Sequence, residues 1–218
     1  MRKALLFAPM LMLLFTACGG GGEERDLTAD LQRQYAGVEA AVLEAGITCH
    51  YDDEIREYTL RCDYGPEKST VTVLSPENLA GISATVERDT LTLSYDDISL
   101  DAGSYSAAAV SPVAALPRLM AAAGTGYPAE QSEETVGERE CLRLACDLPD
   151  QEGTVYTTWF DKETFLPLRS EISVDGTMIF EVAWTRFEIT SAAPAEEAEP
   201  LPPFTEAEEA AAYANAEE

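Results

Sequence analysis

The spacing of hydrophobic residues changes once near the start of the chain, from a helical to a strand period. Apolar residues recur every three or four positions over 27–45, which is typical of one face of an amphipathic helix. Asp26 or Thr28 can cap this helix, and Gly46 follows its last turn. From Ile47 onward the period is two, which indicates strands. The pattern predicts one N-terminal helix followed by a mainly β chain.

The segments up to residue 100 alternate as expected for an antiparallel sheet with one covered face. In 82–87, for example, every second residue is apolar and the residues between them are polar. Turn residues separate the segments, and Arg88-Asp89 joins two of them in a hairpin. The predicted strands are 47–52, 58–64, 69–74, 82–87, 91–95 and 98–100.

A helical insert follows these strands. Ser111-Pro112 is a suitable N-cap and first-turn pair, and the apolar spacing continues to Ala123, with Gly124 after it. Pro117 lies inside this segment, where it lacks an N–H and crowds the preceding turn. We therefore expect the insert to be split into two short helical pieces.

The second half again reads as strands, over 132–137, 139–147, 154–161, 167–174 and 177–190. Asp175-Gly176 is a strong signal for a two-residue hairpin turn, which places Ile172 opposite Ile179. The last strand is apolar on both faces. Such a strand is covered on both sides or lines a hydrophobic concavity.

The chain is strongly acidic. Forty acidic and fourteen basic residues give a formal net charge of −26. This charge repels nucleic acid and anionic lipid headgroups, and it suits a basic protein partner. The segment 191–218 is rich in Ala, Glu and Pro and carries no basic residue, so we expect a disordered tail.

The first residues have the features of an export signal. Arg2 and Lys3 precede an apolar run over 4–15, which is too short for a permanent membrane span. Because the signal closes on Cys18, it resembles the lipobox of bacterial lipoproteins. The resemblance implies that the Cys18 sulfur carries a diacylglyceryl anchor on the outer face of the cytoplasmic membrane. The alternative is an ordinary signal peptide that happens to end on cysteine.

Four further cysteines lie in the exported part, which permits two disulfides in three connectivities. Cys141 and Cys146 lie in one predicted strand, about 16 Å apart and on opposite faces, so they should not pair. Cys49 and Cys62 flank a predicted hairpin tip and can meet across it. The alternative for these two is a pair of buried, reduced thiols.

The order of elements resembles the lipoprotein-carrier fold, an incomplete barrel of antiparallel strands around helices. It is similar to exported lipoproteins of spore-forming, single-membrane bacteria, including the clostridial germination lipoprotein. We therefore expect an α+β domain over 27–190, after a signal peptide (1–17) and a lipidated, glycine-rich tether (18–26). The segments that carry the likeness are 71–82, 91–96, 111–117, 159–161, 166–168 and the hairpin at 175–176.

The resemblance implies two uses. Carriers of this fold hold acyl chains between sheet and helices, whereas the germination lipoprotein binds a cell-wall amidase. We expect a protein partner in the envelope, with a hydrophobic ligand such as an acyl chain as the alternative. No binding residue can be transferred to a position of this chain.

Catalytic signatures are missing from the sequence. His50 adjoins Cys49, but neighbouring strand residues point to opposite faces and cannot form a nucleophile pair. The aspartates at 96, 97 and 101 lack the ligand spacing of a calcium loop and read as turn residues. Motifs for hydrolases, zinc sites and phosphate loops are also missing. We expect a protein that is not an enzyme and needs no cofactor or metal.

Overall fold

The computed structural model describes residues 26–51, 54–106 and 111–191, and it contains two helices and eleven strands there. The helices are α1 (Leu27–Ala36) and α2 (Pro112–Thr125). The strands are β1 (Val38–Tyr51), β2 (Glu54–Tyr64), β3 (Lys68–Ser75), β4 (Ser83–Glu87), β5 (Thr90–Tyr95), β6 (Ile98–Ser104), β7 (Tyr127–Val136), β8 (Arg139–Asp147), β9 (Thr154–Asp161), β10 (Pro167–Val174) and β11 (Thr177–Ser191).

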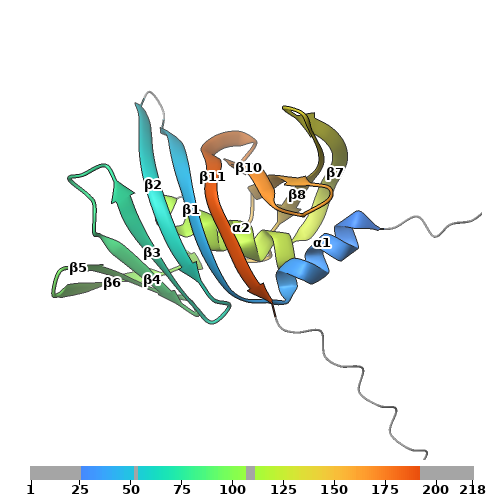
Figure 1. Ribbon diagram of the computed structural model, residues 1–218. Helices are drawn as coiled ribbons and strands as arrows, with labels where there is room; N and C mark the ends of the chain where they lie inside the picture. Colours follow the sequence, from blue (N-terminus) through green and yellow to red (C-terminus); the bar gives the residue numbers. More distant parts are fainter. Residues whose placement is uncertain (1–25, 52–53, 107–110, 192–218) are drawn as a thin grey trace, which may run out of the picture.

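All eleven strands belong to one antiparallel sheet, in the order β6-β5-β4-β3-β2-β1-β11-β10-β9-β8-β7. The long strands β1 and β11 pair at the centre and join two meanders, β1–β6 and β7–β11. The sheet curves around the helices and stays open, with β6 and β7 as its free edges (Figure 1). This confirms the predicted fold class, an α+β incomplete barrel that wraps helices.

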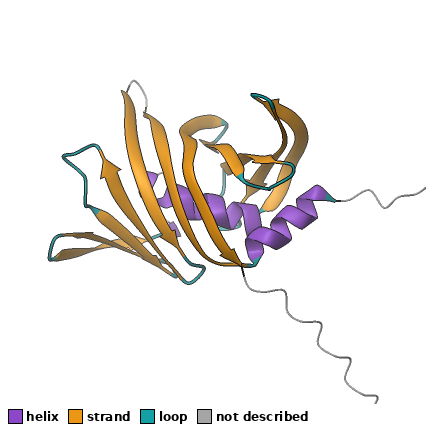
Figure 2. Ribbon diagram, viewed as in Figure 1, coloured by secondary structure: helices purple, strands orange, loops and turns teal. Residues whose placement is uncertain are grey.

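The core lies between the concave face of the sheet and the helices (Figure 2). Alternate residues of β1 face inward, as the period of two requires: Ala41, Leu43, Ala45, Ile47 and Cys49 are all buried. From α2, Leu116, Leu119 and Met120 join the same cluster. The residues between the buried ones on β1 lie on the outer, convex face.

The N-terminal helix is shorter than predicted. It ends at Ala36, and residues 38–51 form β1 instead of continuing the helix to 45. Gly37 caps α1, since its N–H donates to the carbonyl of Arg33 at 3.2 Å. Val38, Val42 and Leu43 continue the helical spacing, whereas Ala41, Leu43 and Ala45 alternate as a strand does. Pairing with β2 and β11 on either side stabilises the strand.

The prediction of a broken insert was wrong, because α2 is one helix that passes through Pro117. Pro117 is the sixth residue of α2, and there it removes only the bond to the carbonyl of Val113. Gly124 lies inside α2 and not after it. A side chain at Gly124 would lie 2.9 Å from the backbone nitrogen of Ala36, so the glycine permits close contact with the end of α1.

The other predicted strands are present, and several are longer than expected. The Asp175-Gly176 turn is also present, but Ile172 lies opposite Phe180 and not opposite Ile179. A bulge between Ile172 and Ser173 shifts the register by one residue. No helix in the described ranges is long and apolar enough to cross a membrane.

Candidate functional site

Side chains fill the centre of the space between the sheet and the helices. Two hollows open at its rim, one of about 410 Å³ between the start of α1 and β7–β8, and one of about 110 Å³ between α2 and the β2–β4 end of the sheet. At the centre a cavity of about 10 Å³ remains, against roughly 300–1,000 Å³ for pockets that hold small molecules. Tyr35 of α1 closes part of it, with its ring 5.2 Å from that of Phe160 and its hydroxyl donating to the carbonyl of Phe165 at 2.8 Å. Its lining is mostly apolar: Tyr35, Leu119, Met120, Ala123, Thr158, Phe160, Pro167, Trp184 and Phe187.

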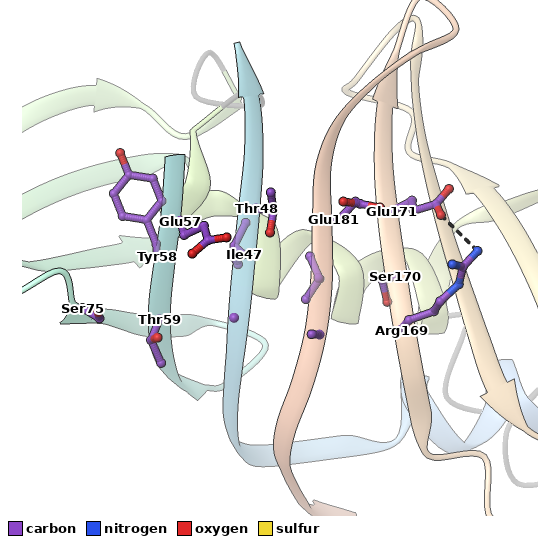
Figure 3. Close-up of a pocket in the computed structure, with 13 residues that line it drawn as sticks. Ile47, Thr48, Glu57, Tyr58, Thr59, Ser75, Arg169, Ser170, Glu171 and Glu181 are labelled. Carbon is purple, nitrogen blue, oxygen red and sulfur yellow. Dashed lines mark ion pairs between the residues drawn. The ribbon is translucent and has the colours of Figure 1, made fainter. Parts of the chain in front are cut away.

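A larger depression, which we call the outer-face groove, lies over β1, β2, β10 and β11. It has a volume of about 430 Å³ and is open to solvent (Figure 3). Its floor is formed where Gly46 pairs with Thr59 on one side and Ala183 on the other. No atom lies within 4 Å of the position that a side chain at Gly46 would take. Small residues at the centre of the sheet therefore leave this space.

Acidic and hydroxyl side chains form one wall of the outer-face groove. Strand pairing places Thr48 between Glu57 of β2 and Glu181 of β11, and Glu171 of β10 opposite Glu181. These four residues thus follow one line across four strands. All of them lie on the outer face, as Figure 3 shows.

The side chains of Arg169 and His50 border the same row. Arg169 lies 3.1 Å from Glu171, and its guanidinium carbon lies 3.9 Å from the ring centre of Trp159, which holds it at one end of the groove. His50 contacts Glu181 at 3.2 Å. Glu57 has no ion pair with a lysine, arginine or histidine among the described residues. The groove therefore offers carboxylate acceptors suited to a lysine or arginine side chain from outside.

Cys49 and His50 do not form a nucleophile pair beside the groove. His50 lies on the outer face, whereas Cys49 is buried in the core, so the two point apart as the sequence predicted. In the described part of the chain, no cluster of His, Cys, Asp and Glu could hold a metal ion.

The predicted disulfide between Cys49 and Cys62 is not formed, and this prediction was wrong. Cys49 lies opposite Arg56 and Cys62 opposite Leu43, which separates the thiols along β2 by about 20 Å. Burial raises the pKa of Cys49 to about 11, and that of Cys62 to about 12. Both thiols therefore stay protonated and unreactive at neutral pH.

Cys141 and Cys146 are also free and buried, and they do not pair with each other. Burial raises the pKa of Cys146 to about 12. Cys18 and the tail after residue 191 lie outside the described residues.

Sequence reasoning did not identify the groove. Gly46 was interpreted as the end of a helix, and the glutamates at 57, 171 and 181 are distant in the sequence. Their alternation with core residues indicates an outer face, but only the strand order brings them into one row.

No protein-family model matches this chain, and no curated protein does. Among solved structures, it is similar to a DUF1329 family protein from Desulfovibrio piger, with 13% identity over 77% of this chain and 92% of that one, and a TM-score of 0.47. A LolA superfamily protein from Nitrosomonas europaea gives 12% identity, 77% and 94% coverage and a TM-score of 0.45. Lipoprotein LppX of Mycobacterium tuberculosis gives 15% identity over 74% of this chain and 94% of that one, with a TM-score of 0.40. These likenesses concern the path of the chain, and we transfer no residue from them.

Proposed function

We propose that this protein is a non-catalytic binding protein of the cell envelope, anchored by a lipid on Cys18, which holds a basic segment of a protein partner in the outer-face groove. The observation that carries the proposal is the contrast in free space. About 430 Å³ lies open on the outer face, whereas the apolar cavity at the centre of the space between the sheet and the helices measures about 10 Å³, and the larger hollows there lie at the rim.

The charges of the groove favour a basic partner. Glu57, Glu171 and Glu181 lie in one row with Thr48, and Arg169 is already held by Glu171 and Trp159. A net charge of −26 adds a long-range field that attracts a basic protein and repels an acidic one. The finer proposal, from the resemblance above, is that the partner is a cell-wall amidase that acts in spore formation or germination.

Photo-cross-linking in the native cell tests this proposal. A photoreactive residue at Thr48 should give one dominant product with an envelope protein. The same residue at Thr85, on the outer face of β4, is the matched control and should not. Replacing both Glu57 and Glu181 with Gln should lower the yield at Thr48 several-fold. Equal products from both positions, or a yield that the Gln pair leaves unchanged, would contradict the proposal.

A second candidate function is the binding of a hydrophobic ligand, such as an acyl chain, between the sheet and the helices. The apolar lining of that interior, with Leu119, Phe160 and Phe187, favours it. It requires the helices to move away from the sheet, because the side chains now fill the space. Uptake of a fluorescent fatty acid at a ratio of one per chain would favour this candidate over the first.

A further inference from the structure

The edge strand β6 leaves half of its backbone groups unpaired. It pairs with β5 on one side, and no strand of the described residues pairs with it on the other. The two-residue turn Asp96-Asp97 makes Tyr95 and Ile98 the closing pair of the hairpin. Because antiparallel pairs alternate, the N–H and C=O groups of Ser99 then point away from β5, toward solvent. Such an edge is a template for one more strand.

Large apolar side chains lie along this edge without cover. Tyr95, Ile98 and Leu100 are 53%, 72% and 63% exposed. The register places Tyr95 opposite Ile98, and Leu93 opposite Leu100, so all four share one face of the β5–β6 hairpin. The buried cluster beneath this end of the sheet is small: it contains Ala84, Val86 and Leu91, packed against Leu93, Tyr105 and Val113. The helices thus cover the base of the hairpin and not its tip (Figure 1).

The charge of the hairpin selects the partner. Asp96 and Asp97 form its tip, and Asp101 follows on the face opposite Leu100. No lysine or arginine occurs between Thr90 and Ser106. A second copy of this chain would bring the same aspartates together in a protein of charge −26, so like charges oppose self-pairing. A basic segment meets attraction there instead.

We propose that β6 binds an extended segment of a protein partner as an added strand, and that this segment alternates apolar and basic residues. Its apolar side chains pack on Tyr95, Ile98 and Leu100, and its basic side chains lie on the side of Asp101. Backbone hydrogen bonds along the edge supply affinity, and the two kinds of side chain fix the register. This site lies on a different part of the sheet from the outer-face groove and does not depend on it.

A short synthetic peptide that alternates lysine and valine tests the proposal with the full exported protein. The peptide should bind, should lose affinity with added salt, and should slow hydrogen exchange at the Ser99 amide. A peptide that alternates glutamate and valine should not bind. Absence of binding by the lysine peptide, or equal binding of both peptides, would overturn the proposal.

Proline variants at the two edges provide a matched pair. Ser99→Pro removes an N–H that points away from β5, so it should weaken peptide binding at least about tenfold while the fold is kept. Thr135 has the equivalent position on β7, next to the pair that closes the Gly137-Glu138 turn. Thr135→Pro should leave binding unchanged. Equal loss in both variants would overturn the assignment to β6.

Leu100→Asn keeps all backbone groups and tests the apolar contacts alone. It should weaken peptide binding roughly tenfold, because a leucine that binding would bury is lost. The circular dichroism spectrum should be unchanged. Unchanged affinity, or a stable dimer of the unmodified protein that Leu100→Asn dissociates, would overturn the proposal in favour of no site or of a second copy.

Discussion

The two free edges of the sheet differ in the charge and polarity of their exposed side chains. On β7, Glu130 pairs with Arg143 at 3.1 Å, and Glu133 with Lys162 at 2.8 Å. Pro128 near its start removes an N–H. On β6, the corresponding side chains are Ile98 and Leu100, without charge and largely exposed. Charges and proline are the usual protection of an edge against added strands. The comparison therefore shows that β7, although Tyr127 at its start is exposed, is better protected than β6, which carries a charge only at Asp101.

The same contrast continues beneath the two edges. Near β7, both faces of the sheet are covered. Trp159 is 4% exposed, because Arg169 lies over its ring and Glu134 accepts its indole N–H at 2.8 Å, while Phe160 fills the core on the other face. The wing, which we define as β4–β6, has only its small cluster around Val86 and Leu91. We therefore expect the wing to open more readily than the β7 end.

Large-to-small substitutions should give the largest effects and should separate the two ends. Phe160→Ala should lower the free energy of unfolding by about 3–5 kcal/mol, because it empties a site packed by Tyr35 and α2. Leu91→Ala in the wing should cost about 2 kcal/mol, because fewer groups surround it. Urea unfolding of both variants measures this difference. A larger loss for Leu91→Ala would contradict the comparison.

Arg118 of α2 should connect the wing to the rest of the protein. It is 4% exposed, pairs with Asp150 at 2.6 Å, and lies 4.1 Å above the ring of Tyr105, which follows β6. Arg118→Met should cost about 1–3 kcal/mol, since Asp150 is half-exposed and solvent stabilises it after the pair is lost.

Hydrogen exchange should also become faster in the wing of Arg118→Met than in β8 and β9. Arg186→Met is the control. Arg186 is exposed and pairs with Glu44 and Glu188, and its loss should leave the urea midpoint almost unchanged, because solvent screens both pairs. Uniform acceleration over all strands in Arg118→Met would exclude the connecting role.

Placing a charge on β6, or an apolar residue on β7, should change peptide binding and self-association more than it changes the free energy of unfolding. Ile98→Lys should alter the free energy of unfolding by only about 0.5 kcal/mol, since the side chain is 72% exposed. The same variant should abolish binding of the basic peptide. Glu133→Val on β7 should increase self-association, which light scattering detects, because it removes the charge and the pair with Lys162. Monomeric behaviour of Glu133→Val would show that charge is not what protects β7.

The smallest expected effect concerns pH at the β7 end. The hydrogen bond from Trp159 lowers the pKa of Glu134 below its usual value of 4.5, and bonding from Ser132 and the charge of Arg143 add to this. A lowered pKa stabilises the folded state above pH 4.5, and this contribution is lost as pH falls through the lowered value. Glu134→Gln should therefore have a lower urea midpoint than the unmodified protein at neutral pH. The gap between the two midpoints should become smaller in acid. A constant difference would contradict this sign.

The sequence predicted most of the strands because alternation is a local property. It located β8 and β9 to the residue and the hairpin at Asp175-Gly176. It misplaced the end of α1, because Val38, Val42 and Leu43 continue the helical spacing, and only pairing with β2 and β11 makes this segment a strand. It placed Cys49 and Cys62 together because it put the hairpin tip near residues 54–56, whereas these residues belong to β2 and Cys49 lies opposite Arg56. Strand order could not be predicted from the local pattern. Because the acidic row of the outer-face groove and the identity of the two edge strands both depend on strand order, neither could be predicted.

The central claim is that recognition takes place on the outer face and the edge of the sheet, while side chains fill the apolar centre of its inside. A comparison of the native and the denatured mass of the full protein, purified from its own cells, tests this most directly. Covalent acyl groups appear in both masses, so their difference reports only what is held without a covalent bond. We predict that the native mass exceeds the denatured mass by nothing other than the mass of a bound protein partner. A lipid-sized difference present on every molecule would contradict the claim.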